Sequence, residues 1–540
     1  MKTTPAYTLG LDFGTLSVRA LIVDTRDGRA VAEAVSDYAH GVMDSAMPDG
    51  TSLPPRFALQ HPRDYLDSMK AAIGEALAAA YTAEGVTPRE IAALGVDFTA
   101  CTMLPVDGDG TPLCFDPAFA GEPHAYVKLW KHHGATEEAD EITALAAARG
   151  EEWLSAYGGT VSCEWMLPKI LETLRKAPAV FKAAHRFMEA ADWLSLLLTG
   201  RETHAAAFAG YKGLWYEGDY PSEEFLTALE PALGGLVGSK IAPAVDPVGE
   251  VAGRLTEYGA ALTGLPVGTP VALPMIDAHA ALPATGMTRS GDLTLILGTS
   301  TCHILNSDRL RKIQGVCGYV KDGVIPALYT YEAGQAAVGD CFDWFVKNCV
   351  PVSYTEAAKA SGLGIHAYLR SLADKKVPGE SGVMALDWWN GNRSILMDQT
   401  LTGTIVGLTL ATKPEDIYRA LIEATAFGTR VIVEQMEQGG LSIGRVMAAG
   451  GIARKDPMMM QIYADVLNRP IEVSKASQTG ALGSAIYAAV AGGVYPSVTE
   501  AADRMAAEVE RVYEPEAEAV EVYEEMFGKY KELYEYFGKR

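Results

Sequence analysis

The first 35 residues carry the feature that most constrains the fold. The stretch Tyr7–Val35 contains three short apolar runs, Thr8–Leu11, Val18–Val23 and Val31–Val35, and an Asp-Gly pair separates the last two. Runs of this length with such a turn signal predict a three-stranded meander. The first strand leads directly into Asp12 and then into a tight corner, so an acid is expected beside the first turn.

The residue types at this corner suit phosphate binding. Gly14 lets backbone N–H groups approach an anion closely, and the hydroxyls of Thr15 and Ser17 can donate to phosphate oxygens. Arg19 could add positive charge if its side chain points inward. Asp12 is a hard oxygen ligand suited to Mg²⁺, directly or through water. The chain contains no GxxxxGK[ST] motif, so this is not a P-loop. The alternative is an ordinary hairpin with a surface Asp and Arg.

A second stretch in the later half of the chain repeats the pattern. Residues Asp292–Leu305 read DLTLILGTSTCHIL, an apolar strand that runs into Gly298-Thr299-Ser300-Thr301 and then into a second apolar strand. This corner lines up with Gly14-Thr15-Leu16-Ser17. Two such corners about half a chain apart suggest a duplicated domain, with a boundary near Gly286–Gly291. A nucleotide held between the two corners would lie in an interdomain cleft, as in the actin-like ATPase fold.

Composition narrows the class of protein. The chain has 540 residues, which predicts about two to four domains, and its 49% hydrophobic content is globular. The net charge of −23, without a Lys/Arg block, argues against nucleic-acid binding. The seven cysteines are odd in number and scattered, which favours reduced thiols over a disulfide framework or a zinc site. Without a signal peptide or a run of about 20 apolar residues, a cytoplasmic location is expected.

The remaining chain alternates strand and helix patterns, which predicts α/β domains with central sheets. The segment beyond Pro496 is expected to be helical to its end. Helices are expected at residues 61–81, 126–133, 137–148, 164–174, 190–198, 278–284, 458–467 and 479–491, and strands at 91–96, 271–276, 446–449 and 471–473.

Asp277 is the sharpest single candidate for catalysis. It lies where an apolar strand ends and a helix begins, which is the usual ligand crevice of an α/β sheet. Phosphoryl transfer to an alcohol needs a carboxylate that orients and deprotonates the hydroxyl. Asp12 has a comparable position at a strand end, so one acid could bind Mg²⁺ and the other could act on the acceptor hydroxyl. As an alternative or in addition, Asp277 could cap the helix.

Weaker signals lie in three other places. Gly450-Gly451 follows a strand and precedes a helix, where a flat adenosine could lie against the backbone, although Gly-Gly turns are common. Lys212 and Glu332 each lie among aromatic and small residues, and such polar groups could bind a polyhydroxylated sugar. The pair His132-His133 lacks metal-ligand spacing and is expected to be a solvated helix end.

Together these residues resemble the FGGY carbohydrate kinases, over almost the whole chain. Segments GVDFTACTM and VKLWKHH are the most diagnostic. The resemblance is carried by these two and by GLDFGTLSVRALIVD, HPRDYLDSM, GGTVSCEWMLPKI, AGYKGLWY, DAHAALPATG, LGTSTCHIL, YEAGQAAVGDCFDWFVK, ALDWWNGNRS, AFGTR and AAGGIARKDPMMMQIYADVLNRP.

The resemblance implies two actin-like, ribonuclease H-like domains and MgATP-dependent phosphorylation of a ketopentose at its terminal hydroxyl. Lys455 departs from the Asn that many family members carry four residues after the second Gly, so the adenine contact is open. The resemblance implies that Asp277 is the catalytic base. It implies that the phosphates are bound by Asp12, Gly14, Thr15, Ser17, Arg19, Gly298 and Thr299, with Mg²⁺ held on Asp12 through water, and that adenosine is bound by Gly450 and Gly451. It implies that the sugar is bound by Ala100, Lys212, Glu332 and Asp277, with Trp130 nearby.

The sequence therefore predicts a sugar-binding domain over residues 1–287, a nucleotide-binding domain over 288–500 and a helical tail over 501–540. The acceptor that the resemblance favours is L-ribulose, on the arabinose route. D-ribulose or xylulose, or a non-catalytic sensor of sugar or ATP, are the alternatives. The expected partners are the sugar and ATP, without nucleic acid or membrane, and a homodimer is left open.

Overall fold

Two units, each built around its own β-sheet, divide the chain. The structure is a computed structural model that describes residues 7–539. Unit 1 comprises the chain up to Arg289 together with Gly318–Thr330 and Gln478–Ala507. Unit 2 comprises Ser290–Cys317, Tyr331–Ser477 and the chain from Glu508 onward. The chain therefore passes between the units several times, and the domain boundaries expected at 287/288 and 500/501 stay predictions.

The central sheet of unit 1 confirms the predicted meander. Its strand order is β3-β2-β1-β5-β10-β9, and β11 also pairs with β5. The strands β1 and β2 are antiparallel, whereas β1 and β5 are parallel, with Asp12 opposite Asp97. The strands of unit 1 are β1 (Tyr7–Phe13), β2 (Ser17–Asp24), β3 (Ala30–Asp37), β4 (Leu59–Gln60), β5 (Ile91–Phe98), β6 (Met103–Val106), β7 (Val127–Lys128), β8 (Arg186–Glu189), β9 (Val251–Arg254), β10 (Pro270–Ala272), β11 (Met275–Ile276) and β14 (Gly318–Lys321).

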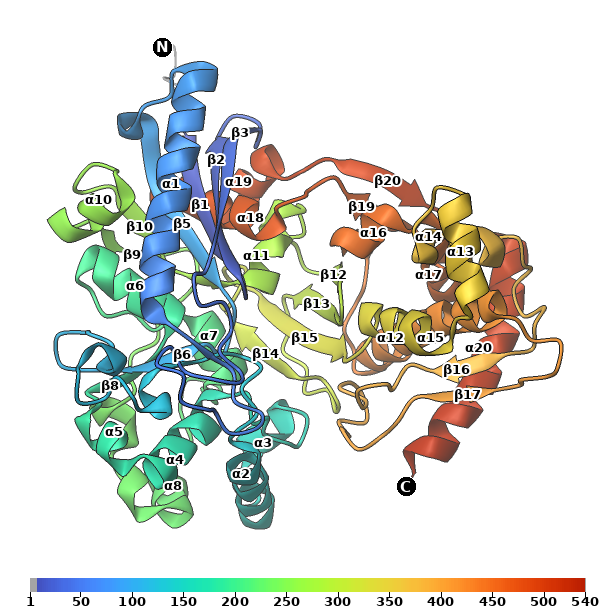
Figure 1. The fold of residues 1–540 in the computed structure, drawn as a ribbon, viewed down its shortest axis with the longest axis horizontal. Helices are drawn as coiled ribbons and strands as arrows, with labels where there is room; N and C mark the ends of the chain where they lie inside the picture. Colours follow the sequence, from blue (N-terminus) through green and yellow to red (C-terminus); the bar gives the residue numbers. More distant parts are fainter. Residues whose placement is uncertain (1–6, 540) are drawn as a thin grey trace. The chain divides into compact units, whose positions relative to one another are not determined.

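Helices cover both faces of this sheet. The helix α1 packs on β2 and β3, and α18 packs on β1 and β5 from the other side (Figure 1). The helices of unit 1 are α1 (Pro62–Glu84), α2 (Thr136–Arg149), α3 (Glu152–Ala156), α4 (Met166–Lys176), α5 (Pro178–Ala183), α6 (Ala190–Thr199), α7 (Ala206–Lys212), α8 (Glu223–Leu229), α9 (Leu236–Ser239), α10 (Glu257–Thr263), α11 (Asp277–Ala284), α18 (Thr479–Ala491) and α19 (Val498–Met505).

Glycines allow α18 to lie very close to the sheet. A Cβ on Gly10 would come within 1.8 Å of the Ala481 carbonyl oxygen, and one on Gly95 within 2.0 Å of the Ser484 carbonyl oxygen. Neither strand position therefore tolerates a side chain without displacement of the helix. This close approach brings the first turn of α18 to the carboxyl ends of β1 and β5.

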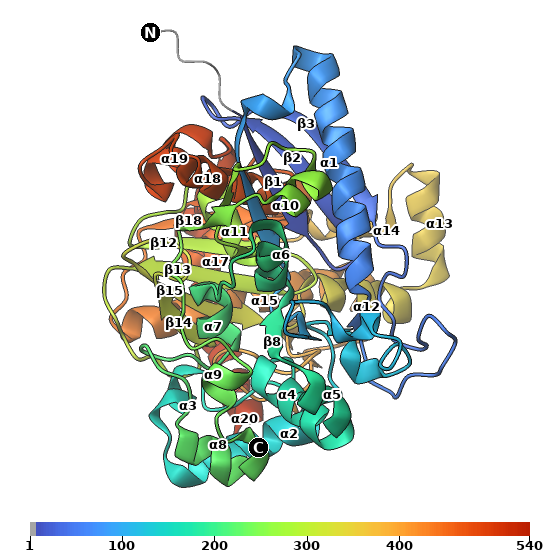
Figure 2. The ribbon, with the colours of Figure 1, turned by 90° about the vertical axis from the view of Figure 1, so that its left-hand side faces the viewer.

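A second layer of unit 1 is mostly helical and surrounds a small four-stranded sheet, ordered β4-β7-β6-β8. Figure 2 shows α2, α3, α4, α5 and α8 gathered in this layer. Tyr126, Trp153, Tyr157 and Trp165 belong to its hydrophobic core.

The helix expected over residues 126–133 is wrong. Val127–Lys128 is the short strand β7, which pairs with β4 and β6. Strand pairing and one buried lysine override the local helical pattern. Lys128 is only 2% exposed, and its Nζ donates to Glu172 Oε2 at 2.6 Å and to Thr173 Oγ1 at 2.8 Å.

The expectation of a solvated His132 is also wrong. His132 is fully buried, and its Nε2 lies 2.9 Å from Glu172 Oε2. Burial lowers the pKa of His132 to about 4. His133 is half exposed and contacts Glu164 at 3.0 Å.

The sheet of unit 2 repeats the plan of the first. Those strands of the sheet that belong to unit 2 follow the order β15-β13-β12-β18-β19-β20. Again the first hairpin, β12–β13, is antiparallel, and β12 is parallel to a later strand, β18. The strands are β12 (Asp292–Leu297), β13 (Thr301–Ser307), β15 (Tyr329–Gln335), β16 (Met384–Leu386), β17 (Thr404–Val406), β18 (Arg445–Ala449), β19 (Ile471–Ser474) and β20 (Val509–Tyr513).

The helices of unit 2 pack mainly on α15, which contacts α12, α14, α17 and α20. The predicted cap of α17 is confirmed, because the Asp456 side chain accepts from the Met459 N–H at 3.0 Å and Pro457 follows. The helices are α12 (Gly339–Cys349), α13 (Val352–Ala360), α14 (Ile365–Ala373), α15 (Pro414–Gln438), α16 (Gly451–Lys455), α17 (Pro457–Leu467) and α20 (Ala517–Gly538).

The segment beyond Pro496 is not helical throughout. Between α19 and α20 the chain forms β20, which pairs antiparallel with β19 and closes the edge of the sheet of unit 2. Within residues 7–539, every helix is too short or too polar to cross a lipid bilayer.

Candidate functional site

The first corner is held by a hydrogen bond within the turn and by contacts from two other segments of the chain. The Gly14 N–H donates to the Ser17 carbonyl at 3.0 Å, which closes the turn. Gln60 Nε2 donates to the Thr15 carbonyl at 2.8 Å, and the indole N–H of Trp130 donates to Thr15 Oγ1 at 3.2 Å. The corner therefore has a fixed backbone, and Trp130 lies directly beside it.

The corner also carries an ion pair. Arg19 Nη1 lies 3.2 Å from Asp12 Oδ2, and the Asp12 side chain is 14% exposed. Arg19 thus points toward the acid and places positive charge at the corner. An anion at the corner would therefore meet the guanidinium as well as the backbone N–H groups.

Three acids lie at the carboxyl ends of neighbouring parallel strands. Asp12 near the end of β1 is in register with Asp97 on β5. Met275 on β11 is in register with Asp97, and Asp277 follows at the start of α11. Asp277 Oδ1 accepts the Ala278 N–H at 2.7 Å. The predicted pair of strand-end acids is thus part of a set of three, at the edge where α/β sheets bind ligands.

Asp97 was not among the site residues that the sequence predicts. It is fully buried, and its Oδ2 accepts from Ser484 Oγ at 2.7 Å. Burial and then the charge of Asp12 raise the pKa of Asp97 well above its usual range, and Asp277 adds to this. The available signal was its place at the end of a buried strand, which it shares with the other two acids.

Gly480 in the first turn of α18 leaves room for this group of acids. A Cβ on Gly480 would lie 3.0 Å from Asp12 Cγ, and 3.1 Å from both Asp12 Oδ2 and Asp97 Oδ1. Both carboxylates therefore border the same glycine at a helix N-terminus, where partial positive charge stabilises negative groups. The set of hard oxygens at this point fits a Mg²⁺ site.

The predicted sugar residues of unit 1 lie in its turns. Ala100 lies in the turn between β5 and β6, Trp130 lies just after β7, and Lys212 is the last residue of α7. The charge of Lys212 lowers the pKa of the Cys101 thiol, although burial raises that pKa overall. Lys212 therefore lies near the turn that holds Ala100. Glu332 lies on β15 in unit 2.

The second corner is also closed by a hydrogen bond from its glycine, although the acceptor lies two residues on and not three as in the first corner. The Gly298 N–H donates to the Ser300 carbonyl at 2.9 Å, and the Val338 N–H donates to the Thr299 carbonyl at 2.7 Å. Gly450 has φ +100°, and a Cβ there would lie 2.4 Å from the Leu297 carbonyl oxygen. Only glycine fits at this position, where β18 turns into α16 beside the corner.

A pocket of about 480 Å³ in unit 2 joins the predicted nucleotide residues. Gly298, Thr299 and Gly451 line it, and so does Lys455. Its size is that of a small-molecule site. The pocket therefore brings together the second phosphate corner and the Gly-Gly turn, which lie about 150 residues apart in the chain.

Several pocket residues carry no local signal in the sequence. Phe342 and Tyr418 supply aromatic rings to its wall, and Arg370 on α14 supplies charge. Arg370 Nη1 donates to the Lys455 carbonyl at 2.7 Å and lies 3.2 Å from Asp456 Oδ2. Arg370 thus fixes the turn between α16 and α17 from a distant helix, which only the tertiary structure reveals.

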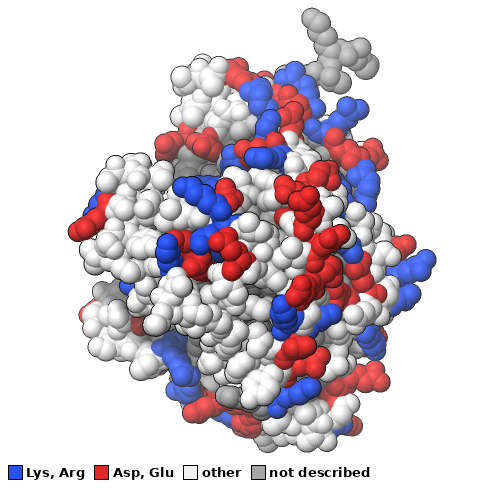
Figure 3. All heavy atoms as spheres, turned by 90° about the vertical axis from the view of Figure 1, so that its right-hand side faces the viewer, with Lys and Arg blue, Asp and Glu red and all other residues white. Residues whose placement is uncertain are grey.

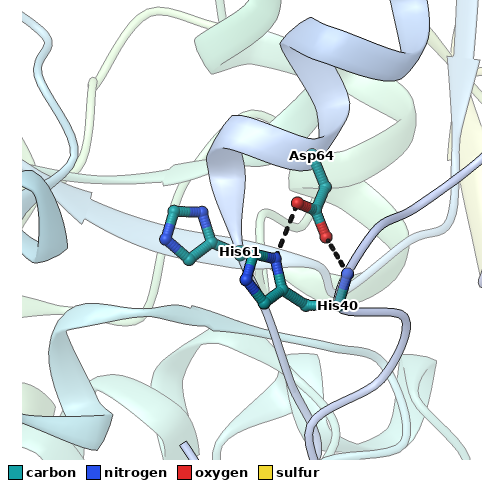
Figure 4. Close-up of side chains that lie close together, drawn as sticks. All are labelled: His40, His61 and Asp64. Atoms are coloured by element: carbon teal, nitrogen blue, oxygen red, sulfur yellow. Dashed lines mark hydrogen bonds and ion pairs between the residues drawn. The ribbon is translucent and has the colours of Figure 1, made fainter. Parts of the chain in front are cut away.

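A cluster of His40, His61 and Asp64 has the residue types of a metal site (Figure 4). The Asp64 carboxylate accepts from the His40 backbone N–H at 2.9 Å and lies 2.8 Å from His40 Nδ1. His61 Nδ1 accepts the Arg63 N–H as the cap of α1. The positive end of a helix disfavours a cation, so the geometry is that of a helix cap that anchors the preceding loop.

Charge on the surface is mixed. The face drawn in Figure 3 shows acidic side chains in a band, with basic side chains interspersed and broad neutral areas. This agrees with the net charge of −23. A net charge far from zero promotes solubility, because the molecules repel one another, and it gives no information about the site.

The comparison with protein families defines the class. The N-terminal domain of the FGGY family of carbohydrate kinases matches residues 7–283, and the C-terminal domain of that family matches residues 293–492. The chain belongs to the FGGY family of carbohydrate kinases and is a sugar kinase with two actin-like, ribonuclease H-like domains.

Curated relatives sharpen the comparison. Ribulokinase of Geobacillus thermodenitrificans is 46% identical over 539 residues, which cover 99% of this chain and 95% of that protein. Ribulokinase of Mycolicibacterium smegmatis is also 46% identical, over 99% of this chain and 94% of that protein. Ribulokinase of Staphylococcus aureus is 39% identical over 99% of this chain and 97% of that protein.

Solved structures share the fold. Xylulose kinase from Rhodospirillum rubrum has a TM-score of 0.81 at 25% identity, covering 99% of this chain and 100% of that one. Gluconate kinase from Lactobacillus acidophilus has a TM-score of 0.80 at 18% identity, covering 99% of each chain. The fold predicted from the two repeated corners is therefore confirmed.

Proposed function

We propose that this kinase transfers the γ-phosphoryl group of ATP to the C5 hydroxyl of L-ribulose and makes L-ribulose 5-phosphate, as a step of L-arabinose catabolism. The observation that carries the proposal is the similarity to proteins named ribulokinase, at 39–46% identity over 97–99% of the chain. The segments GVDFTACTM and VKLWKHH, which are diagnostic in the sequence, each comprise the end of a strand and the turn that holds Ala100 or Trp130.

In this proposal Asp277 is the base. Its carboxylate takes the proton of the C5 hydroxyl as the new O–P bond forms, and the bond between the β- and γ-phosphates breaks to release ADP. Asp277 is the first residue of α11 and directly follows β11. This is the edge at which α/β sheets bind ligands, so the placement suits the role.

The two corners would hold the phosphates. Thr15 in unit 1 and Thr299 in unit 2 would offer their hydroxyls to phosphate oxygens, and Gly14 and Gly298, which lack a Cβ, would let a phosphate approach the backbone closely. Asp12 would hold Mg²⁺ through water, and when bound the ion neutralises charge on those oxygens.

The 480 Å³ pocket of unit 2 would hold the adenosine. There Gly451, which directly follows Gly450, presents bare backbone, and Phe342 and Tyr418 present flat rings. The sugar would contact Ala100, Lys212, Glu332 and Asp277, with Trp130 beside it.

One observation favours another ketopentose as the alternative substrate: the xylulose kinase of Rhodospirillum rubrum shares the fold at 25% identity. A coupled assay of ADP release separates the two. We expect kcat/KM for L-ribulose to exceed that for D-ribulose, L-xylulose, D-xylulose and ribitol under one set of conditions. If kcat/KM were highest for D-xylulose, the proposed substrate would be wrong, but the proposed kinase activity would still be supported. A sensor would bind sugar or ATP and release no ADP with any of them.

Lys212 tests the sugar site directly. A site built to bind a hydroxyl rejects analogues that leave its charged groups unpaired. We therefore expect Lys212→Ala to raise KM for L-ribulose strongly and to lower discrimination among the pentoses. Unchanged discrimination would remove Lys212 from the sugar site.

A further inference from the structure

The turn that carries Ala100 must be held by its surroundings. Alanine has no polar side chain, so any contact of Ala100 with sugar hydroxyls depends on where its backbone lies. The next residue, Cys101, has φ +57°, in the left-handed region that a residue with a Cβ adopts only under constraint. A turn of this kind persists only where its neighbours determine it.

Two buried charged residues determine this turn. Lys169 on α4 donates from Nζ to the Cys101 carbonyl at 2.6 Å. Glu189 at the end of β8 accepts the Thr102 N–H on its Oε2 at 3.0 Å. Burial raises the pKa of Glu189, and hydrogen bonds from the backbone of Thr102 and of Cys101 partly offset that rise. The polar backbone groups that follow Ala100 are thus bound by one lysine and one glutamate.

Lys169 also reaches a second segment of the site. Its Nζ donates to the Leu129 carbonyl at 2.9 Å. Leu129 immediately precedes Trp130, whose indole N–H donates to Thr15 Oγ1 at 3.2 Å. The ammonium group of Lys169 therefore binds both Cys101, the residue after Ala100, and Leu129, the residue before Trp130. Because Trp130 contacts Thr15, this network also reaches the first phosphate corner.

Stability alone does not account for these two charges. Lys169 is fully buried and Glu189 is 2% exposed. Apolar residues of similar volume usually stabilise a core as well as or better than buried charges. What apolar residues cannot do is bind two backbone carbonyls and a backbone N–H in one fixed arrangement.

We propose that Lys169 and Glu189 are positioning residues of the sugar site, which hold the backbone of residues 100–102 and 129–130 in the shape that the ketopentose requires. The proposal rests on the proposed function for the identity of the sugar. Neither side chain touches the sugar. They act through Ala100 and Trp130, so their loss impairs sugar binding and leaves nucleotide binding intact.

The test compares two buried lysines. Lys169→Met removes the donors to both segments at nearly constant volume. Lys128→Met is the matched control, because Lys128 is equally buried but binds Glu172, Thr173 and the Lys169 carbonyl, and neither of the two segments. We expect KM for L-ribulose to rise about tenfold or more in Lys169→Met. We expect KM for ATP to change by less than about twofold, and discrimination among pentoses to fall.

Two substitutions of Glu189, one conservative and one not, provide a second test. Glu189→Gln keeps an oxygen that can accept the Thr102 N–H, whereas Glu189→Leu does not. We expect Glu189→Leu to resemble Lys169→Met and Glu189→Gln to lie close to the wild type. Equal effects of the two substitutions, or equal KM changes in the Lys169 and Lys128 variants, would overturn the positioning role.

Amide hydrogen exchange gives a readout that does not depend on activity. In Lys169→Met, peptides that cover residues 99–103 and 129–133 should exchange faster than in the wild type and in Lys128→Met. Unchanged exchange in both peptides would contradict the proposal even if KM rose. A wild type that phosphorylates no ketopentose would overturn the proposed function alone, and the exchange data would then decide the positioning role.

Discussion

The phosphate corners of the two units share a backbone plan and differ in their side chains. In each unit a strand runs into Gly-Thr, turns into an antiparallel partner and lies parallel to a later strand. Two residues before the glycine, unit 1 has Asp12, which is opposite Asp97. The equivalent position in unit 2 is Ile296, which is opposite Ala449.

This difference separates two tasks. Both corners carry a Gly-Thr pair. In unit 1 the strand position before the corner holds Asp12 opposite Asp97, and these acids suit the proton transfer and Mg²⁺ binding proposed for that unit. In unit 2 the equivalent strand position is apolar, and the charged residues of the 480 Å³ pocket, such as Asp340 and Arg370, come from helices instead. The duplicated plan thus predicts that chemistry depends on unit 1 and nucleotide affinity on unit 2.

The largest effect is expected at Asp277. Asp277→Asn keeps the shape of the side chain and removes the base, so kcat should fall about a hundredfold or more. KM for the sugar should change much less. Steady-state kinetics on the purified variant check this, with its melting temperature as the control for folding. Near-normal turnover in a folded variant would remove Asp277 from the mechanism.

A smaller loss of turnover is expected from Gly480→Ala. The new Cβ would lie 3.0–3.1 Å from Asp12 and Asp97, so the carboxylates or the start of α18 must shift. Displacement of this kind costs about 1–3 kcal/mol when a core is overpacked, and here it disturbs the acid beside the first corner. We expect kcat to fall about tenfold or more while KM for ATP stays near the wild-type value. A variant with full turnover would show that the placement of Asp12 is not critical.

Gly451→Ala is the matched change in unit 2. A Cβ at Gly451 meets no atom within 4 Å, so the fold should tolerate it. The methyl group would enter the space proposed for adenosine, and KM for ATP should rise several-fold while kcat changes little. Nucleotide titration of both glycine variants makes the comparison. A fall in kcat with unchanged KM for ATP would contradict the division of tasks between the units.

The last prediction concerns stability and not kinetics, at Glu189 beside the turn of residues 100–102, and no change in turnover is expected from it. Burial raises the pKa of Glu189 from 4.5 to about 7. The folded state therefore binds the proton more tightly than the unfolded state, and the contribution of Glu189 to stability is full below about pH 4.5 and is lost as pH rises to about 7. Glu189→Gln should cancel up to about 3 kcal/mol of this pH dependence. Urea unfolding of both proteins at pH 5 and pH 8 measures it, and parallel pH profiles would contradict the shift.

Local chemistry made much of the molecule predictable. Both hairpins, the cap of α17 and the small-residue helix α18 are predictable because each depends on residues close together in the chain. The position of Asp277 at a strand end was equally visible. The failures came where distant partners decide the outcome. Residues 126–133 have a helical composition, yet Lys128 lies in a strand. Its buried ammonium group binds Glu172, which lies 44 residues further on in the chain. The segment beyond Pro496 likewise contains β20 because β19 offers it an edge.

By itself the sequence determined which residue types stand at each corner, since a tight phosphate turn requires glycine and hydroxyls within a few residues. It also determined the family, through segments that run along the whole chain. Only the tertiary structure decided that Asp97 joins Asp12, that Arg370 fixes the turn at Lys455 and that Lys169 binds both Cys101 and Leu129. The physical reason is that strand register and the burial of long side chains depend on contacts between residues tens to hundreds of positions apart. No local pattern encodes such contacts.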